Sequence, residues 1–573
     1  MDAINTEIKG FDWESVRAQI GRIRQAFGAS SVACGVLHRG KPAFHHAEGF
    51  ADVRTQRVPD ADTIYPIASC SKAFTSATCA ILVDEGLLSW DRPVSSYLPE
   101  FQTVHNAEVS QRATLVDLCS HSTGLAPMDH AIIGFHDEYL NDGVDQVKIS
   151  SNLPVLCDFR TAFVYNNFTY GVVGEVISRV CNKSIGSVMA DKIFEPLGLL
   201  RTYVRTADYP PDGNVAKGYS VLDDGSFLAV GDPEIQDGSA HAGAGLVRST
   251  VNDMLRWAKA VMQAEKQQEL VTSSQDMPVK KPPLPGVAFT RSEQRCIISD
   301  PTEAEGENSY GLGWFRHTIP SQWLGSISPN FMLLPDPPVI GQHSPERLAI
   351  SHYGAMGGFL SALYTFPETC SAVVVLANSS PSRGDPTDLI AQSLCQELFD
   401  MKPRVPLELF ALRAAETSRL IWPALVHSWV LAREKTDMVP VLTDYIGTYR
   451  NSGLQLRIDV FESQRSSKCL GRQQHDPEPL SFTVNSHARQ TAKLKHYQLD
   501  VWTFLPNSRD DASRKGMELY MALPLVLLSF VRDKTGQVRW LDWDLYGGGG
   551  QPELHDVYYI VDPVRFERVS SLV

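Results

Sequence analysis

A serine and a lysine stand three residues apart in the segment Ala68-Ser69-Cys70-Ser71-Lys72, where an apolar helical stretch begins. At the start of a helix, residues three apart lie on one face. The helix N-terminus also offers backbone N–H groups that suit a developing oxyanion. A serine hydroxyl becomes a nucleophile when a neighbour takes its proton, and a partly buried lysine with a lowered pKa can do so. The pattern therefore predicts Ser69 as a nucleophile with Lys72 beside it.

The same spacing also fits a helix-capping serine followed by a solvated lysine. None of the other 17 lysines has a serine three residues before it, so no rival pair competes. The choice between the two readings depends on the surrounding segments. Four of them bear on it: 85–101 (EGLLSWDRPVSSYLPEF), 114–125 (TLVDLCSHSTGL), 163–177 (FVYNNFTYGVVGEVI) and 242–258 (AGAGLVRSTVNDMLRWA).

Together with Ser69-x-x-Lys72, these segments resemble the serine β-lactamase and penicillin-binding superfamily. The similarity is to its class C-like branch of esterases, D-peptidases and acyltransferases. It covers roughly residues 12–400, apart from much of 270–345. The resemblance implies an acyl-enzyme formed on Ser69.

The second motif of this branch is Tyr-x-Asn, which we place at Tyr165-Asn166-Asn167. The same pattern occurs at Tyr139 and Tyr449, but only Tyr165 precedes an apolar helical stretch in matching surroundings. The resemblance implies that Tyr165 is the general base or shares a proton network with Lys72, and that Asn167 binds the acyl side of the substrate. The alternative is a core tyrosine packed at a helix start.

The third motif, usually Lys-x-Gly on a strand, corresponds to His352-Tyr353-Gly354. We expect Gly354 to let the substrate backbone approach the strand, and the N–H of Ala355 to be the second oxyanion donor. A histidine is mostly neutral at pH 7, so a substrate carboxylate loses its partner, which argues against β-lactamase activity. A buried, hydrogen-bonded His352 is the alternative, and His38, His241 and Lys534 begin rival patterns in poorer contexts.

Two expectations concern protonation. A cationic Lys72 close to Tyr165 is expected to lower the pKa of the phenol, and burial to lower that of the lysine. We expect kcat/KM to rise with pH through an apparent pKa between about 7 and 9 that belongs to the pair. An ionisation at about 6.5 would point to His352 instead.

The elements that must position these residues follow from hydrophobic spacing. Helices are expected at 12–27, 72–87, 170–182, 386–399 and from Ser249 onward, and strands at 31–38, 42–50, 309–315, 347–353, 359–366 and 371–377. Strands from both ends of this region predict one sheet. The fold class is α/β (α+β): a β-lactamase-like mixed antiparallel sheet with a helical subdomain, followed by a small antiparallel β-barrel.

We place the hydrolase domain at 1–402, with a proline-rich insertion at 270–345 that shapes or merely decorates the site. A connecting helix at 403–440 and a β domain at 441–573 follow. The last part has short strand-like runs, and DYIGTYRN and FVRDKTGQVRWLDW resemble the lipocalin-like domain attached to some of these hydrolases. The resemblance implies that this domain packs near the site and restricts it.

The net charge of −14 disfavours nucleic acid and anionic membranes as partners. The ten cysteines show no zinc-type spacing, so we expect neither a metal nor a cofactor. The polar N-terminus lacks the apolar stretch of a secretory signal, and no apolar run reaches membrane length, so we expect a cytoplasmic protein with free thiols.

The leading hypothesis is a serine hydrolase acting on an ester or amide of a small molecule or short peptide. An acyltransferase would use the same residues to pass an acyl group from a thioester or acyl carrier to a small-molecule acceptor. A non-catalytic scaffold that keeps the fold is the third hypothesis, although it would have no need of Ser69, Lys72 and Tyr165 together. The oligomeric state stays open.

Overall fold

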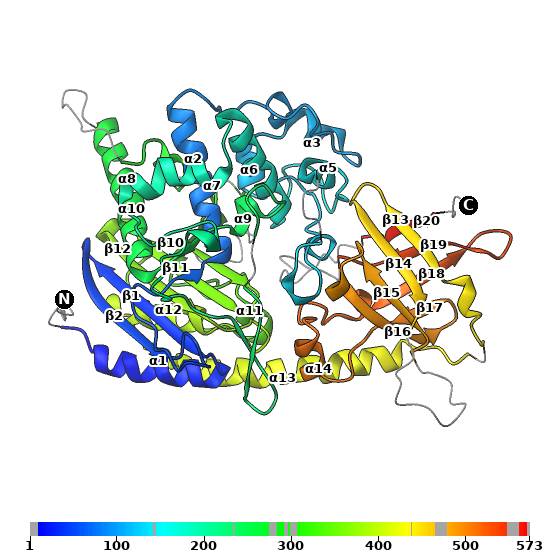
Figure 1. The fold of residues 1–573 in the computed structure, drawn as a ribbon. Helices are drawn as coiled ribbons and strands as arrows, with labels where there is room; N and C mark the ends of the chain where they lie inside the picture. The colour runs from blue at the N-terminus through cyan, green and yellow to red at the C-terminus, as the bar shows by residue number, and fades with distance from the viewer. Residues whose placement is uncertain are drawn as a thin grey trace.

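The computed structural model of the chain describes residues 10–140, 145–232, 235–273, 283–291, 296–297, 306–436, 438–463, 478–546 and 561–569. Figure 1 shows a sheet flanked by helices, a β-barrel beside it, and one long helix running beneath both. Across the described ranges, no helix combines the length and apolarity that a membrane crossing requires.

The central sheet joins the two ends of the hydrolase region. Its strand order is β2-β1-β12-β11-β10-β9-β8-β7 and its neighbouring strands pair antiparallel. The first strand pairs with the last, since Val32 lies opposite Ala377. The predicted fold class is confirmed. The bounds are β1 Ser31–His38, β2 Lys41–Gly49, β7 Cys296–Ile297, β8 Asn308–Tyr310, β9 Phe315–Ile319, β10 Arg347–Met356, β11 Phe359–Phe366 and β12 Ser371–Ala377.

Alternating side chains give this sheet two buried faces. In β1, Val32 and Val36 pack in one core cluster with α1 (Trp13–Phe27) and α12 (Pro386–Leu398). Ala33 and Leu37 point the other way, into the larger cluster that includes α10 (Val251–Ser273). Successive side chains on a strand face opposite sides of the sheet. Because helices cover both sides, these strands carry apolar side chains at successive positions.

The helical subdomain is built around α2, Ser71–Asp84, which is buried along nearly its whole length. An all-round apolar helix of this kind belongs in a core. Its neighbours include α6 Asn167–Cys181, α7 Ile185–Met189 and α9 Ala242–Gly245, with α3 Ala107–Arg112, α4 Leu115–Cys119 and α5 Gln146–Ser151 further out.

The single strand expected at 309–315 is wrong. The segment forms a hairpin in which β8 and β9 pair, with Tyr310 opposite Phe315. The backbone N–H of Gly311 donates to the carbonyl of Trp314 at 2.7 Å, and Gly313 has φ +81°. Only glycine adopts that conformation without strain. The chain therefore turns back at Gly313, and the segments on either side of the turn pair with each other.

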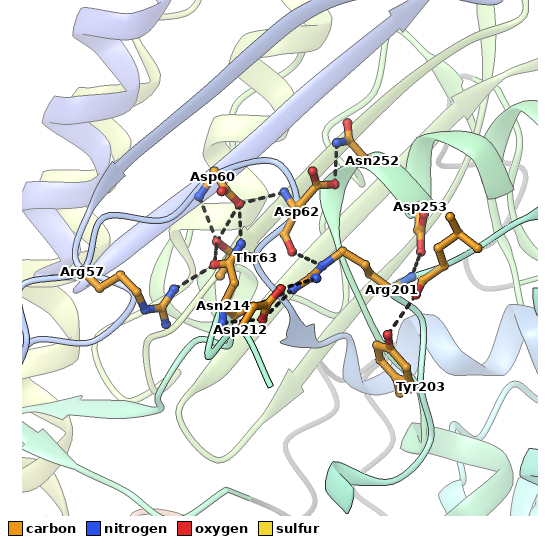
Figure 2. Close-up of polar contacts among 11 residues, drawn as sticks. Arg57, Asp60, Asp62, Thr63, Arg201, Tyr203, Asp212, Asn214, Asn252 and Asp253 are labelled. Carbon is orange, nitrogen blue, oxygen red and sulfur yellow. Dashed lines mark hydrogen bonds and ion pairs between the residues drawn. The ribbon is translucent and has the colours of Figure 1, made fainter. Parts of the chain in front are cut away.

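A polar cluster fixes the loop that leads to Ser69 (Figure 2). Arg201 donates from Nε to the carbonyl of Asp62 at 2.8 Å and pairs with Asp212 at 2.6 Å, while its backbone N–H donates to Asp253 at the start of α10. The short strand β3 (Tyr65–Pro66) follows, paired with β6 (Arg248–Ser249). Three distant segments thus hold the approach to the helix α2.

The helix α13, Leu407–Leu431, leads from the sheet region to the barrel and lies under both (Figure 1). The predicted C-terminal β-barrel is confirmed as a closed antiparallel barrel, β13 to β20, in which β13 also pairs with β20. Its strands are β13 Gly447–Asn451, β14 Leu456–Glu462, β15 Leu480–Val484, β16 Thr491–Gln498, β17 Val501–Thr503, β18 Leu527–Arg532, β19 Val538–Trp543 and β20 Val564–Arg568; α14, Arg509–Arg514, lies between β17 and β18.

Candidate active site

Ser69 lies in a short 3-10 turn, Ala68–Cys70, that runs directly into α2. Ala68 has φ +45°, a conformation that an alanine adopts only at a cost in free energy and that the surrounding structure must hold. The turn brings Ser69 to the wall of a cavity. As one of the first residues of a helical segment, Ser69 has a backbone N–H without an intrahelical acceptor, as the predicted oxyanion role requires.

Lys72 is fully buried with its Nζ 3.0 Å from Ser69 Oγ. The same Nζ donates to Asn167 Oδ1 at 2.7 Å and to the carbonyl of Ala244 at 3.4 Å. A neutral amine has two N–H donors and one lone pair. The two carbonyl oxygens take the donors, so the lone pair is left for the hydroxyl of Ser69.

Burial lowers the pKa of Lys72 to about 7, although the charge of Asp129 opposes the shift. Transfer of an ammonium out of water disfavours the charged form. An unperturbed lysine titrates near 10.4 and is almost entirely protonated at neutral pH. The unprotonated amine is therefore accessible near neutral pH, so Lys72 can accept a proton from Ser69.

Tyr165 lies beside this pair, and the expectation of a lowered pKa for its phenol is wrong. Burial raises the pKa of Tyr165 above its ordinary value, while a hydrogen bond with Ser69 opposes the shift. Nζ of Lys72 lies 4.6 Å from the centre of the Tyr165 ring, over its face rather than beside its hydroxyl. Tyr165 therefore stays a neutral phenol, and the lysine is the better proton acceptor of the two.

Asn167 links Lys72 to a second polar group that the sequence did not point to. Its Nδ2 donates to Asp129 at 2.9 Å, which directs Oδ1 toward Lys72. Burial raises the pKa of Asp129, but the hydrogen bond and charge of His241 and the bond from Asn167 outweigh it, so the carboxyl is ionised. His241 lies 3.3 Å from Asp129 and, through its other nitrogen, 3.3 Å from the hydroxyl of Tyr139.

Asp129 carried no motif signal, and Tyr139 and His241 appeared in the sequence only as rival matches to the second and third motifs. All three line the cavity with Ser69. Their spacing along the chain, 38 residues from Asp129 to Asn167 and 112 to His241, hides the contact. Within the described residues, no group of three or more His, Cys, Asp or Glu side chains is arranged to hold a metal ion.

The segment 114–125 positions the Tyr-x-Asn motif. Asn166 caps α6 by accepting from the backbone N–H of Phe168 at 2.9 Å. Its own N–H donates to His121 Nδ1 at 3.0 Å, and its amide donates to the carbonyl of Leu125 at 2.8 Å. Side-chain capping of this kind fixes where a helix starts. Tyr165 and Asn167, which flank Asn166, are thereby held in place.

His352 is buried and does not line the cavity. Its Nδ1 lies 2.6 Å from the carbonyl of Tyr353 and must carry the proton, so Nε2 accepts from the hydroxyl of Tyr310 at 3.0 Å. Burial, helped by the nearby Lys72, holds the pKa of His352 well below its ordinary value. The ring is neutral in the working range, so it supplies neither a cation nor an ionisation near neutral pH.

Gly354 packs closely against the protein itself. A β-carbon at this position would lie 2.3 Å from the carbonyl oxygen of Ile67 and 3.0 Å from the β-carbon of Ala68. This close approach is made by the protein's own segment that carries Ser69, and the approach of a substrate to Gly354 stays a prediction. Ala355 does line the cavity, and β9 pairs with β10 only from Arg347 to Ser351, short of this point. Its role as oxyanion donor stays a prediction.

Ser69, Asn167 and Ala355 open onto a cavity of about 570 Å³. This is the size of a small-molecule site. Three segments far along the chain complete its wall: Ile327–Leu333 from the proline-rich region, Ser418 to Trp422 of α13, and Arg509, Glu518, Leu519 and Met521 from the barrel side. The described part of the proline-rich region thus shapes the cavity, and residues of the C-terminal part form another side of its wall.

Comparisons with known proteins agree with this site and fold. The Beta-lactamase family model matches residues 17–394. The chain is 25% identical over 374 residues to the "Unguisins hydrolase ungD" of Aspergillus violaceofuscus, covering 63% of this chain and 59% of that relative. It is also 25% identical to the "Beta-lactamase" of Escherichia coli, over 62% of this chain and 86% of the relative.

A solved structure, the octameric penicillin-binding protein homologue from Pyrococcus abyssi, shares the fold with a TM-score of 0.54 at 18% identity, covering 97% of this chain and 100% of that one. The family match spans well over half of the chain and includes Ser69, Lys72 and Tyr165. The resemblance noted in the sequence is confirmed: the chain belongs to the Beta-lactamase family of serine hydrolases.

Proposed function

We propose that this protein hydrolyses an ester or amide of a small molecule or short peptide through an acyl-enzyme on Ser69. The observation that carries the proposal is the 3.0 Å contact between Ser69 Oγ and a fully buried Lys72 whose pKa is lowered to about 7. A base with a pKa near the working pH is the most effective proton acceptor.

In the acylation step, Lys72 takes the proton of Ser69 as Oγ attacks the substrate carbonyl. The electron pair of the C=O bond moves onto oxygen, which the N–H groups of Ser69 and Ala355 stabilise. When the intermediate collapses, the bond to the leaving group breaks and the leaving group takes the proton from Lys72. Tyr165, neutral and in hydrogen-bond contact with Ser69, passes this proton along.

A water molecule then repeats the sequence and releases the acid. A hydroxyl or amine of an acceptor in place of water would give acyl transfer, with the same residues in the same roles. The cavity wall contributed by α13 and by the barrel side restricts access to the site, and exclusion of water is the condition under which transfer competes with hydrolysis. Incubating the protein with an acyl thioester, with and without small alcohols and amines, separates free acid from condensed product.

The decisive experiment is intact-mass analysis after exposure to a fluorophosphonate and to a panel of p-nitrophenyl esters and p-nitroanilides. One adduct per chain, mapped to Ser69, supports the acyl-enzyme. If Ser69 is never labelled and no substrate is turned over, the scaffold hypothesis replaces the proposed function.

The pH dependence is the first expected result. Since only unprotonated Lys72 accepts the proton, kcat/KM is expected to rise with pH through about 7 and to level off above it. The charge of Asp129 raises the pKa of Lys72. Asp129→Asn is therefore expected to move the rising limb to lower pH, measured as initial rates over a buffer series.

Asp191→Asn is the matched control, because Asp191 pairs with Lys183 at 2.6 Å outside the cavity and its loss is expected to leave the limb in place. His352→Gln tests the histidine. If the limb disappears in His352→Gln but stays put in Asp129→Asn, the ionisation belongs to His352 and the assignment of Lys72 is wrong.

The second expected result concerns β-lactams. The neutral, buried His352 cannot pair with the carboxylate of a penicillin. A charge-assisted hydrogen bond is worth about 1.5–3 kcal/mol, so its absence costs roughly 10–150-fold. We expect kcat/KM for penicillin or nitrocefin to fall below that for a short-chain activated ester by at least this factor. Equal values for the two substrates would contradict the argument.

A further inference from the structure

Two carboxylates from opposite parts of the chain face the same cavity as Ser69. Asp137 ends the short turn Phe135–Asp137 of the hydrolase region, and Glu518 follows α14 on the barrel side. Both line the cavity wall. The charge of Glu518 contributes to the raised pKa of Asp137, so the two carboxyl groups lie close together.

Asp137 has fewer polar contacts than Glu518. Its carboxyl is deeply buried, and the surface that it retains lines the cavity. Oδ2 packs against Gly357, where a β-carbon would come within 2.2 Å. Across the described residues, the carboxyl of Asp137 has no ion pair and accepts no hydrogen bond. A buried carboxylate without a partner is costly, and such groups are normally paired.

Glu518 is held by neutral donors alone. Ser513 donates to Oε1 at 2.6 Å, and Ser220 and Ser380 donate to Oε1 and Oε2. These hydroxyls come from three separate segments, so the carboxylate is fixed in position. Within the part of the chain that the structure describes, Glu518 forms no ion pair, and its charge is oriented but not neutralised.

Among the described residues that line the cavity, the one arginine or lysine is already engaged. Arg509 lines the cavity but pairs with Asp223 at 2.9 Å and donates to the carbonyl of Val221 at 2.8 Å and to Ser382 at 3.2 Å. Burial and the charge of Glu518 raise the pKa of Asp137 to about 6, so Asp137 is still mostly ionised at pH 7. The cavity wall therefore carries two carboxylates that no arginine or lysine of the described residues pairs with.

We propose that Asp137 and Glu518 bind a primary ammonium group on the acyl part of the substrate, an inference that rests on the proposed hydrolysis at Ser69. Carboxylates that keep their charge and lack a cation attract an ammonium, whose three N–H donors suit two acceptors. Through Glu518, the barrel side thereby supplies one of the two carboxylates that select the substrate.

The position of Gly357 sets the reach of the acyl chain. Gly357 follows Ala355 by two residues, in the turn after β10 (Arg347–Met356), so the two residues are at most roughly 7 Å apart. We take this reach as the expected separation between the ammonium and the reacting carbonyl. The N-terminal amine of a dipeptidyl group and the ω-amine of an aminohexanoyl group both span this distance, whereas the amine of a single aminoacyl group does not.

The test compares amine and amide at constant chain length. The substrates are the p-nitroanilides of glycylglycine, glycine and 6-aminohexanoic acid, each with a free amine and as its N-acetyl derivative. We expect kcat/KM to favour the free amine by at least about tenfold for the two longer chains, the size of one charge-assisted hydrogen bond. For the glycine pair we expect a ratio near one.

Asp137→Asn and Glu518→Gln keep the shape and the hydrogen-bonding atoms of each side chain, and asparagine tolerates the positive φ of Asp137. Each is expected to bring the ratio of free amine to N-acetyl substrate toward one. Asp191→Asn, which removes an ion-paired carboxylate outside the cavity, is expected to leave the ratio unchanged.

Binding without turnover separates this inference from the proposed function. We expect n-pentylammonium to bind Ser69→Ala at least about tenfold more tightly than n-pentanol, and this preference to be lost when Asp137→Asn is added. Ammonium binding in a protein that turns over no substrate would overturn the hydrolysis and keep the cation site. Turnover with equal rates for free and acetylated amines would overturn the cation site alone. The cation site would also be overturned if sodium ions stabilised the Ser69→Ala protein as much as n-pentylammonium does.

Discussion

Replacing Ser69 with alanine is expected to abolish turnover of every substrate that the protein hydrolyses. Its hydroxyl is the one that Lys72 contacts at 3.0 Å and that faces the cavity at the start of α2. Loss of the nucleophile from a hydroxyl–base unit costs on the order of 10⁶ in kcat. The measurement is the initial rate on the best ester or anilide, with background hydrolysis subtracted.

The fold is expected to survive this change. Ser69 keeps part of its surface exposed to the cavity, and alanine leaves the turn Ala68–Cys70 with all its backbone bonds. Ser96→Ala, which removes an exposed hydroxyl from a separate loop, serves as the control for purification and folding. A Ser69→Ala protein that retains more than a small fraction of the activity would show that the nucleophile lies elsewhere.

Lys72→Met is expected to have the next largest effect, a loss of about 10⁴-fold or more in kcat/KM, since it removes the base and leaves a nucleophile that cannot ionise. Tyr165→Phe is the informative comparison. It keeps the ring beneath Nζ and removes only the hydroxyl. We expect Tyr165→Phe to be slow but to retain the rising pH limb near 7, which the Lys72→Met protein loses together with its activity.

Stability provides a readout of Lys72 that does not depend on catalysis. The pKa of Lys72 is about 7 in the folded protein and about 10.4 in the unfolded chain. Between these values the unfolded state binds more protons, so the free energy of unfolding is expected to rise with pH across this interval. Lys72→Met removes that contribution to the slope. If urea unfolding shows the same slope from pH 7 to 10 in both proteins, the buried amine is not neutral and the proposed base is wrong.

The local sequence pattern was sufficient to predict most of the helices and strands. Within the site, it was sufficient to predict the Ser69–Lys72 pair. The apolar face of Trp13–Phe27 and the alternation in the strands predict the layers, because burial of apolar surface imposes those periods. Ser69 and Lys72 are three residues apart at a helix start, so spacing puts them on one face, and the surrounding segments favoured a contact over a solvated lysine. The hairpin at Asn308–Ile319 was missed because SYGLGWF has apolar or aromatic residues on both sides of Gly313 and resembles one continuous strand.

The sequence by itself indicated the family, the fold class and the nucleophile–lysine pair, since motifs, framework segments and apolar periodicity can all be recognised along the chain. Only the tertiary structure decided what surrounds them. The pKa of Lys72 and the neutral state of His352 are set by burial, which no local pattern reports. Asp129, Asp137 and Glu518 reach the cavity from segments up to hundreds of residues apart, because chain folding and not spacing brings charges together. The proposed chemistry could therefore be predicted from the sequence, whereas the protonation states and the residues of the cavity wall could not.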